Sequence, residues 1–154
     1  MHAKKSRYER ALAQSRALGD ELEVRQSIIP GAGNGLFIAK KKVERNGWIT
    51  WAEGVRIPYA QAIQLRTEHK AGHVIMCERG VWALLTSTNP VAKRGGAQFA
   101  NHQRGAHANA RFCMIRNPMM QCVPFLQATK PIEVGEEVFC SYGSGSFRRD
   151  HFCQ

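Results

Sequence analysis

The sequence predicts a mostly-β protein in which two modest helices accompany several small sheets. Short stretches rich in β-branched and aromatic residues recur along the whole chain, and clusters of Gly, Pro and Asn separate them. Only two stretches have helical character. At 154 residues the chain is long enough to bury one core, and it shows neither internal repeats nor a linker. We therefore expect one domain.

The N-terminal part is predicted to contain one helix and two strands. The helix covers Lys4–Leu18, and Gly19 is placed to cap its C-terminus. The stretch 21–29 alternates in polarity and is rich in β-branched residues, as a strand should be, and Pro30 ends it. The glycine-rich turn GAGNG then leads into a second apolar strand over 36–39.

The central part combines a hairpin signal with the second helix. Asn46 and Gly47 form the hairpin signal, and a strand over 48–54 follows. The helix is predicted from Pro58 to Gly72, because proline suits the first helical turn and glycine the position after the last.

Short strands separated by turns make up the rest of the chain. Segment 87–96 is a predicted loop, and Asn117 with Pro118 forms a predicted turn. The expected strands cover 73–77, 81–85, 110–115, 121–129 and the stretch that follows a turn at Gly135.

The net charge of +10, from 22 basic and 12 acidic residues, favours acidic partners such as nucleic acid, nucleosomes or an acidic protein surface. A solvated basic surface explains the same charge. No zinc-finger or RNA-binding aromatic motif accompanies the basic residues, which argues against primary nucleic-acid recognition. Binding that does not depend on salt concentration would exclude nucleic-acid recognition altogether.

Targeting and membrane segments are not evident. No uninterrupted apolar run approaches the roughly 20 residues of a membrane helix. The N-terminal segment lacks the apolar region of a secretory signal. Its Lys and Arg content would also suit a mitochondrial address, but Glu9 and Glu21 and the even charge spacing favour an ordinary amphipathic helix.

The cysteines are odd in number and irregularly spaced, without a CxxC or CxC pair, which argues against a structural zinc cluster. His69, His73 and Cys77 follow a four-residue step and could share a helical face, but no second set of ligands follows them. We expect reduced intracellular thiols and no metal site. The five cysteines are Cys77, Cys113, Cys122, Cys140 and Cys153.

Three separated segments stand out because local propensity does not explain them. GAGNG is either a tight hairpin turn or a place where backbone comes close to a ligand, and it is not a dinucleotide fingerprint because no helix follows. QFANHQRGAHANARF is a poor helix without strand alternation, and it contains Asn101 and His102. GEEVFCSYG joins a turn, two carboxylates and a short strand to Tyr142.

Taken together and in this order, the segments resemble the SET-domain protein-lysine methyltransferases. GAGNGLFIAKKKVERNGWITWAEG is similar to the family's glycine turn, LF-A strand and G-x-I-x-x-x-x-G hairpin. QFANHQ is similar to the family's RF-INHS, and HANARF to its PNA segment. ATKPIEVGEEVFCSYG is similar to A-x-x-x-I-x-x-GEEL-x-x-x-YG. The resemblance covers about Leu22–Phe147.

This resemblance implies the β-clip fold of SET domains, with several small curved sheets around a C-terminal pseudoknot. The Asn-His and Tyr-Gly segments pass through one another in that knot, which is rare among folds. Such a crossing needs closely packed backbone, so small residues are expected at Gly105, Ala106, Ala108 and Ala110. The implied division is a basic N-terminal helix over 1–20, a SET domain over 21–147 and a short tail over 148–154.

The chemistry that the resemblance implies is transfer of a methyl group from S-adenosylmethionine to a lysine ε-amine, without a metal. Tyr142 matches the family's active-site tyrosine, whose hydroxyl orients the transferring methyl through weak C–H···O contacts. Asn101 would bond the cofactor's amino group. The other implied cofactor residues are Ala32, Gly33 and Asn34 beside the methionine moiety, His102 at the adenine and Phe147 over the adenine ring.

Departures from the family pattern concern the substrate channel. Gln103 replaces the usual Ser after Asn-His, and the RGAH loop after it is longer than in most members. Cys140 stands where the family commonly carries Phe or Tyr, and Phe112 takes over that wall in our interpretation. Ala52, next to Trp51 in the hairpin, stands where some members place a channel tyrosine. These changes imply either a wider channel that permits di- or trimethylation or impaired catalysis.

Histone tails are the leading substrate class that the resemblance implies, with nuclear residence following from that choice. A basic tail suits a basic enzyme poorly, so either an acidic groove or contact with nucleosomal DNA must offset the charge. The groove candidates are Glu53, Glu133, Glu136 and Glu137. The alternative function is a catalytically impaired SET module that serves as a binding scaffold in a chromatin complex.

Overall fold

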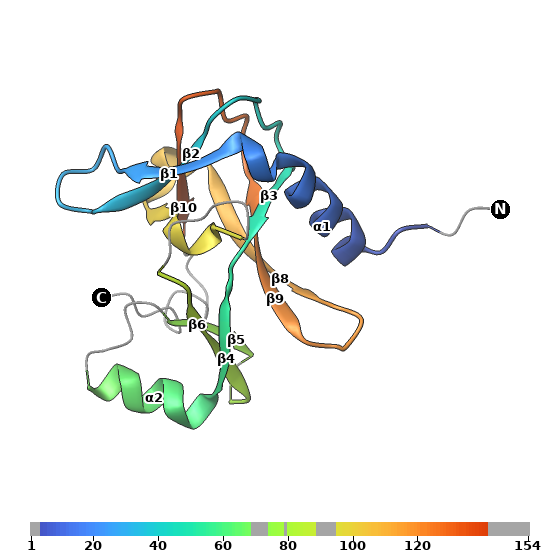
Figure 1. Ribbon diagram of the computed structural model, residues 1–154, viewed down its shortest axis with the longest axis vertical. Helices are drawn as coiled ribbons and strands as arrows, with labels where there is room; N and C mark the ends of the chain where they lie inside the picture. The colour runs from blue at the N-terminus through green and yellow to red at the C-terminus, as the bar shows by residue number, and fades with distance from the viewer. Residues whose placement is uncertain (1–3, 69–73, 79, 89–94, 142–154) are drawn as a thin grey trace.

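Two antiparallel-rich sheets and two α-helices form the protein, which confirms the predicted mostly-β class (Figure 1). The computed structural model describes residues 4–68, 74–78, 80–88 and 95–141. The helices are α1 (Arg7–Leu18) and α2 (Tyr59–Thr67). The strands are β1 (Leu22–Gln26), β2 (Asn34–Ile38), β3 (Trp48–Trp51), β4 (Gly54–Pro58), β5 (Val74–Glu78), β6 (Trp82–Thr86), β7 (Asn101–His102), β8 (Ala110–Arg116), β9 (Cys122–Ala128) and β10 (Glu137–Ser141).

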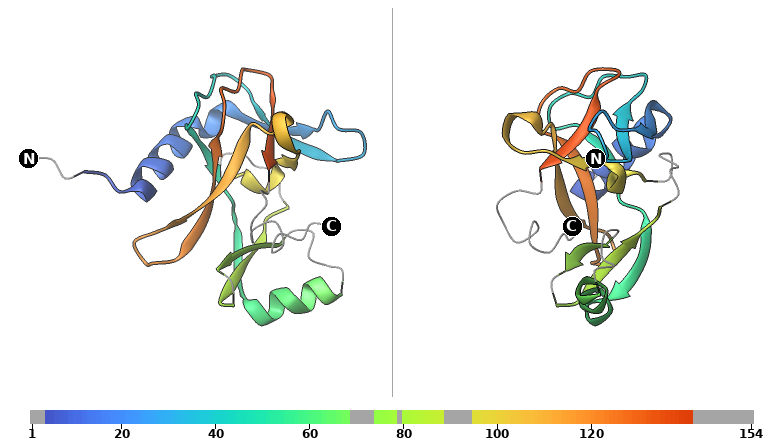
Figure 2. Two further views of the ribbon diagram at one scale, coloured as in Figure 1. Left: turned by 180° about the vertical axis from the view of Figure 1, so that it is seen from behind. Right: turned by 90° about the vertical axis from the view of Figure 1, so that its left-hand side faces the viewer.

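The larger sheet has the strand order β1-β2-β10-β8-β9-β3, with β7 paired to β10, and the smaller sheet has the order β4-β6-β5. Helix α2 packs on one face of the smaller sheet, around the fully buried Ala62 and Val74 (Figure 2). The opposite face, through Ile75 and Leu84, joins the main hydrophobic core shared with the larger sheet. Within the described part of the chain, no helix combines the length and apolar character needed to cross a membrane.

Helix α1 begins later than predicted because Ser6 caps it. The Ser6 hydroxyl accepts from the Glu9 backbone N–H at 3.1 Å, and the Glu9 carboxylate accepts from the Ser6 N–H at 3.2 Å. This reciprocal pair is a capping box, which satisfies two of the free N–H groups at a helix start. Gly19 follows the helix as predicted, but its backbone is right-handed and continues into a short 3₁₀ turn over Gly19–Glu21.

The GAGNG turn joins β1 and β2 into an antiparallel hairpin, as the sequence predicts. The register runs from Leu22 opposite Ile38 to Gln26 opposite Asn34. Gly33 lies in the turn with φ +74°, a conformation that favours glycine. Strand β1 is shorter than the predicted 21–29, because the chain leaves the ladder after Gln26.

The turn at Asn46 and Gly47 is present, but the predicted hairpin is wrong. Strand β3 pairs with β9, not with β2. Ala128 holds the turn from both sides, since its carbonyl accepts from the Asn46 N–H and its own N–H donates to the Gly47 carbonyl, each at 2.9 Å. A strand distant in sequence has therefore replaced the local partner.

The predicted strand over 48–54 is in fact two strands in different sheets. Strand β3 ends at Trp51, and the Ala52 N–H makes the last contact with β9, to the Pro124 carbonyl at 2.9 Å. From Gly54 the chain continues as β4 and pairs with β6. Helix α2 starts after Pro58, as predicted. Its predicted end, Gly72, lies outside the described residues.

Strand β10 connects the N-terminal hairpin to the C-terminal half of the sheet. It runs antiparallel to β2 and parallel to both β7 and β8. The buried Asn109 fixes it, because the Asn109 amide donates to the Glu137 carbonyl at 2.9 Å and accepts from the Phe139 N–H at 2.8 Å. The Asn-His segment and the start of the C-terminal segment thus lie side by side.

The threading of the pseudoknot stays a prediction, because the Tyr-Gly segment lies outside the described residues. Of the small residues expected to permit close packing, Ala110 is fully buried in the core. Gly105 and Ala106 instead lie exposed in a short 3₁₀ turn over Gly105–His107. The expectation of close packing is therefore wrong for these two, since both are exposed and a Cβ at Gly105 would meet no atom within 4 Å.

Candidate functional site

Four chain segments meet where β10 begins, and the carboxylate of Glu137 lies between them. Only 3% of Glu137 is exposed. Its Oε1 accepts from the Ile28 N–H at 2.8 Å and from the Ser27 hydroxyl at 3.0 Å. Its Oε2 accepts from the same hydroxyl at 2.8 Å and from the Asn101 amide at 3.1 Å. Both oxygens accept hydrogen bonds, as a carboxylate in its ionised form does.

Gly35 makes this approach possible. A Cβ at that position would overlap the Glu137 carboxylate and lie 3.3 Å from the Asn101 amide nitrogen. Glycine is therefore required here for close contact, and not for its backbone dihedrals. The two glycines thus have different functions. Gly33 permits the backbone conformation of the turn, and Gly35 permits the close approach of the Glu137 carboxylate to β2.

The Asn101 side chain links this carboxylate to the glycine turn. Its Nδ2 donates to the Asn34 carbonyl at 3.0 Å as well as to Glu137. Because both hydrogens of the amide nitrogen are directed at protein oxygens, Oδ1 is the atom that can accept from a ligand. The backbone of Ala32, Gly33 and Asn34 is exposed beside it. The structure thus brings together the two segments that the resemblance assigns to the cofactor's amino acid part.

His102 lies next to this corner in β7, half-buried and opposite Cys140 of β10. The N–H of the following residue, Gln103, donates to the Cys140 carbonyl at 3.2 Å. Tyr142 and Phe147, the predicted catalytic and adenine-covering residues, lie outside the described residues, so their roles stay predictions.

The predicted channel residues fall into two groups. Ala52, Cys140 and the half-buried Phe112 belong to the main hydrophobic cluster, and Cys140 is fully buried. Trp51 instead packs in the cluster beneath α1, around Phe125. The structure therefore brings three of the four predicted channel residues into one cluster and places Trp51 in another.

A cavity of about 420 Å³ lies where β3 leaves β9 and continues as β4. Trp51 and Ala52 both line it, together with Arg56, whose guanidinium stacks on the Trp82 ring at 4.4 Å. Phe112 and Cys140 are not among its lining residues.

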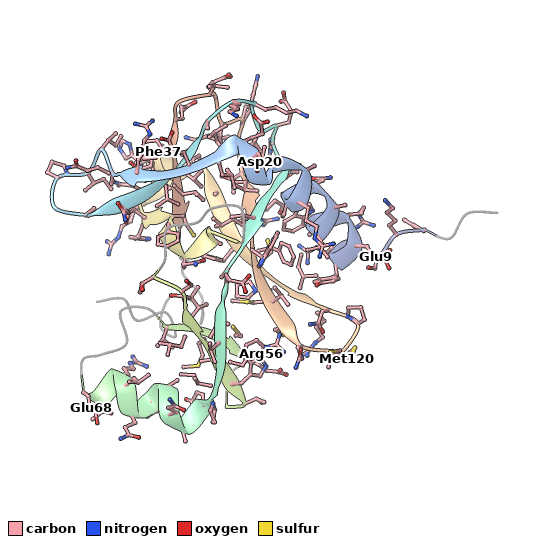
Figure 3. All side chains as sticks on the ribbon, viewed as in Figure 1. Glu9, Asp20, Phe37, Arg56, Glu68 and Met120 are labelled. Carbon is pink, nitrogen blue, oxygen red and sulfur yellow. The ribbon has the colours of Figure 1, made fainter. Side chains whose placement is uncertain are left out.

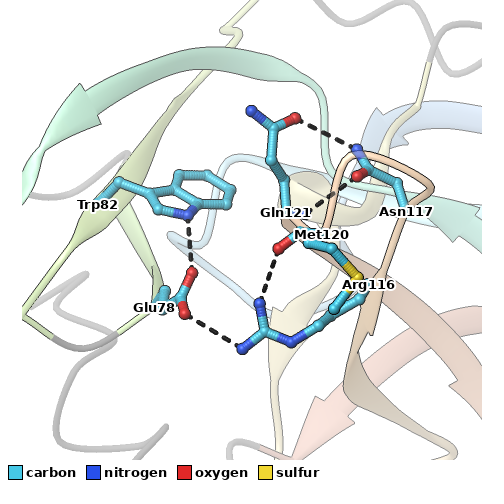
Figure 4. A network of polar contacts seen from close by, with 6 residues as sticks. All are labelled: Glu78, Trp82, Arg116, Asn117, Met120 and Gln121. Carbon is cyan, nitrogen blue, oxygen red and sulfur yellow. Dashed lines mark hydrogen bonds and ion pairs between the residues drawn. The ribbon is translucent and has the colours of Figure 1, made fainter.

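A polar network at this end of the molecule joins the two sheets (Figure 4). Glu78 of β5 accepts from the Trp82 indole at 3.3 Å and pairs with Arg116 of β8 at 3.1 Å. Arg116 also donates to the Met120 carbonyl at 2.7 Å. This hydrogen-bonded ion pair raises the pKa of Arg116. Figure 3 places Met120 and Arg56 at the opposite end of the molecule from Phe37, the β2 partner of Glu137.

The four candidates for the acidic groove have different surroundings in the described part of the chain. Glu137 is buried and holds protein donors, so it cannot face a substrate tail. Glu133 pairs with Lys42 at 3.3 Å, and this hydrogen bond raises the lysine pKa. Glu136 accepts from the Glu133 N–H, and Glu53 lies elsewhere, accepting from the Trp51 indole at 2.9 Å. Of the four candidates, Glu137 is thus buried and Glu133 is paired with Lys42, and a groove formed by the exposed ones stays a prediction.

Among the described residues, Cys77, Cys113 and Cys122 are free thiols. Burial raises the pKa of Cys77 to about 12, so this thiol is unreactive near neutral pH. Among the residues that the structure describes, no three His, Cys, Asp or Glu side chains gather as a metal site requires. His69 and His73 lie outside those residues.

Ser27 and the buried Glu137 were not identified from sequence as parts of this site. Ser27 carries no signal, because a serine after a strand is ordinary. Glu137 sits in a segment that was singled out, but a local pattern of two adjacent carboxylates does not reveal which one is buried. The structure shows that Glu137 is the buried one, because its carboxylate lies against Gly35.

Comparison with known proteins gives likeness in structure only. No protein-family model and no curated protein matches the sequence. Polycomb repressive complex 2 (ctPRC2) in an autoinhibited conformation bound to S-adenosylmethionine matches with a TM-score of 0.64 and 20% identity, over 86% of this chain and 16% of that chain. The humanized mutant of the Chaetomium thermophilum complex matches with a TM-score of 0.63 and 23% identity, over 86% and 15%.

A third solved structure, ctPRC2 in complex with H3K27me3 and H3K27M, matches with a TM-score of 0.61 and 20% identity, over 84% of this chain and 16% of that chain. The present chain thus spans about one sixth of the length of the chains that it matches. Similarity at this identity concerns the fold. The chain has the SET-domain fold.

Proposed function

We propose that this chain is an S-adenosylmethionine-dependent protein-lysine N-methyltransferase. The observation that carries the proposal is the convergence of the Asn34 carbonyl, the Asn101 amide and the Glu137 carboxylate at one corner. These groups come from segments 67 and 36 residues apart in sequence, and hydrogen bonds hold them in one arrangement.

The chemistry of this corner fits the amino acid part of the cofactor. An ammonium group needs acceptors, and Asn101 Oδ1 with the exposed backbone of Ala32, Gly33 and Asn34 would supply them. In this proposal the main chain of His102 holds the adenine and Phe147 covers its ring. When bound, the cofactor supplies an electrophilic methyl group on a sulfonium.

The reaction requires the substrate lysine to arrive neutral. Free lysine has a pKa of about 10.4, and a dry channel beside a sulfonium lowers it. The substrate ammonium would first give its proton to water, and the Nζ lone pair would then accept the methyl group, while the carbon–sulfur electron pair would remain on sulfur. The Tyr142 hydroxyl would orient the methyl, so positioning accounts for much of the rate.

Phe112 is the proposed aromatic wall of the lysine channel. Because Cys140 is fully buried and smaller than Phe or Tyr, it leaves room that Phe112, in the same cluster as Ala52, would border. A channel of that width would accept a lysine that already carries methyl groups. Trp51 is left out of this proposal, since it packs beneath α1.

Histone tails are the proposed substrate class, with residence in the nucleus and contact with a chromatin complex or nucleosomal DNA through the basic surface. The support is the likeness to Polycomb repressive complex 2 structures, one of them in complex with H3K27me3 and H3K27M. The net charge of +10 supports attraction to nucleosomal DNA, and Glu137, one of the four groove candidates, is buried and so is not available to a basic tail.

A second candidate is a catalytically impaired SET module that acts as a binding scaffold in a chromatin complex. The burial of Cys140 in place of an aromatic channel residue, with Gln103 and Ala52, favours it. The intact network around Asn101 favours the enzyme, because a scaffold has no need of an amide oxygen directed at a ligand.

Calorimetry with S-adenosylmethionine, followed by methyl transfer to a peptide array, separates the two candidates. The enzyme hypothesis expects binding and label transfer to lysine peptides, with transfer lost in Tyr142→Phe while binding remains. No binding at millimolar cofactor would refute the enzyme and favour the scaffold. Binding with no transfer to histone peptides or nucleosomes would likewise support the scaffold.

A further inference from the structure

The charge of Glu137 has no cationic partner in the described structure. Its hydrogen-bond donors are a hydroxyl, a backbone N–H and an amide, all of them neutral. Within residues 4–68, 74–78, 80–88 and 95–141, no Lys, Arg or His nitrogen forms an ion pair with it. Arg25, two residues before Ser27, instead pairs with Glu23 at 3.5 Å and stacks on Phe37 at 3.7 Å.

An ionised carboxylate in this position is costly. Neutral donors satisfy its lone pairs but carry no net charge, so within the described residues its negative charge is hydrogen-bonded and not neutralised. Low dielectric surroundings also weaken screening, so the negative potential extends several ångströms beyond the carboxylate. A cation that binds nearby is therefore attracted, whereas a neutral ligand gains nothing from this potential.

Asn101 lies between the carboxylate and the proposed ligand. Its Nδ2 touches Glu137 at 3.1 Å, and its Oδ1 lies on the other side of the same amide. A negative charge behind the nitrogen polarises the amide and makes its oxygen a stronger acceptor. Gly35 keeps this path short, because no side chain separates β2 from the carboxylate.

We propose that Glu137 is a specificity-determining residue, whose buried charge makes the cofactor site prefer the cationic methyl donor over its neutral-thioether product. This inference rests on the proposed function. S-adenosylmethionine carries an ammonium, a carboxylate and a sulfonium, and S-adenosylhomocysteine lacks the sulfonium charge. Because methyl transfer removes the sulfonium charge, the product loses one favourable interaction with Glu137 and dissociates more readily.

The test measures the dissociation constants of both ligands by calorimetry for three variants of the full chain. Glu137→Gln keeps the size and removes the charge. Glu137→Asp keeps the charge and shortens the side chain. Glu136→Gln is the matched control, because the adjacent Glu136 is exposed and its carboxylate accepts from the Glu133 backbone N–H at 2.8 Å.

The expected result for Glu137→Gln is a loss of preference for the donor over the product by on the order of tenfold, the value of one unit charge about 10 Å away at an effective dielectric constant of about 20. Glu137→Asp should weaken the binding of both ligands equally, so the ratio of their dissociation constants stays that of wild type. Glu136→Gln should change neither dissociation constant much and should keep the same ratio. A Glu137→Gln ratio equal to that of wild type would overturn the inference and leave Glu137 with a purely structural role.

The ligands themselves provide a second measurement if Glu137→Gln does not fold, as checked by circular dichroism. Wild-type protein is titrated with S-adenosylhomocysteine and with an analogue that carries a protonated amine in place of the sulfonium. Tighter binding of the charged analogue supports the inference, and equal binding overturns it. If wild-type protein binds none of these ligands, the proposed function itself has failed, which is a different result.

Discussion

Two glutamates in this molecule connect distant segments, and they do so in opposite ways. Glu78 is partly exposed and pairs with the Arg116 guanidinium, so its charge is neutralised within the protein. Glu137 is buried and bonds only to neutral donors among the described residues. The first arrangement joins two sheets and has no charge left for a ligand. The second leaves a charge beside the proposed cofactor site.

Burial and pairing together determine how much a carboxylate contributes to stability and whether its charge can act on a ligand. An exposed, paired carboxylate is screened by water and salt, and its net contribution to stability is small. A buried and unpaired one is costly to the fold, and such strain is expected at functional sites. Substitutions at both places should therefore have very different effects.

The largest effect on stability is expected for Glu137→Ala. The change leaves the buried Ser27 hydroxyl without its acceptor, and likewise the partly buried Ile28 N–H and one Asn101 hydrogen. Two or three such groups cost about 4 kcal/mol in the free energy of unfolding. Urea denaturation of Glu137→Ala and Glu78→Ala measures the contrast, and equal loss in both variants would remove the distinction between the two sites.

A pH-dependent loss is expected from Cys77, whose folded-state pKa is raised to about 12 from 9.0 by burial. The unfolded chain releases this proton near pH 9, whereas the folded chain keeps it, so ionisation favours unfolding above that pH. Stability should therefore fall by about 3 kcal/mol between pH 9 and pH 11.

Cys77→Ala should flatten this pH dependence, and Cys113→Ala is the matched control at a half-buried position. Denaturation curves at several pH values provide the measurement. The same slope in wild type and Cys77→Ala would show that other groups, and not this thiol, cause the alkaline loss.

Gly35→Ala tests the contact between β2 and the Glu137 carboxylate. The new Cβ would overlap the Glu137 carboxylate, so the side chain must move and its contacts with Ser27 and Asn101 must change. We expect a destabilisation of about 2 kcal/mol and weakened cofactor binding. Gly31→Ala has open space around its Cβ, so it tests the backbone alone; equal loss of binding in both variants would argue against the contact.

The smallest effect is expected at the exposed network. Arg116→Ala and Glu78→Gln should each change the stability only slightly, because the pair is accessible to solvent. A double-mutant cycle in low and high salt measures the coupling, which should decrease as salt increases. A salt-independent coupling above about 2 kcal/mol would mean that this pair is as shielded as Glu137.

Much of the fold could be predicted from sequence, because its signals are local. The β1–β2 hairpin follows from its glycine turn, and the β8–β9 hairpin surrounds the predicted Asn117 turn. The pairing of β3 with β9 was missed, since the Asn46–Gly47 signal describes a turn and not the partner of the strand after it. The split of 48–54 into strands of two sheets also depends on distant partners.

Some residues of the candidate site could be predicted from sequence, but its buried charge could not. The resemblance indicated Gly33, Asn34 and Asn101, and the structure brings the last two into hydrogen-bond contact. Nothing in the sequence distinguishes Glu137 from Glu136, although one is buried and the other exposed. Ser27 is 110 residues away from the carboxylate that it contacts, and no local pattern encodes such a pair.

The most direct test of the account is the affinity for S-adenosylmethionine of Asn101→Ala beside that of Asn117→Ala. Both asparagines hold a network of hydrogen bonds, but Asn117 does so in the β8–β9 turn. If the corner at Asn101 binds the donor, its variant loses at least about tenfold in affinity, a loss of 1.4 kcal/mol, while Asn117→Ala binds as wild type does. Unchanged binding by a folded Asn101→Ala protein would contradict the account.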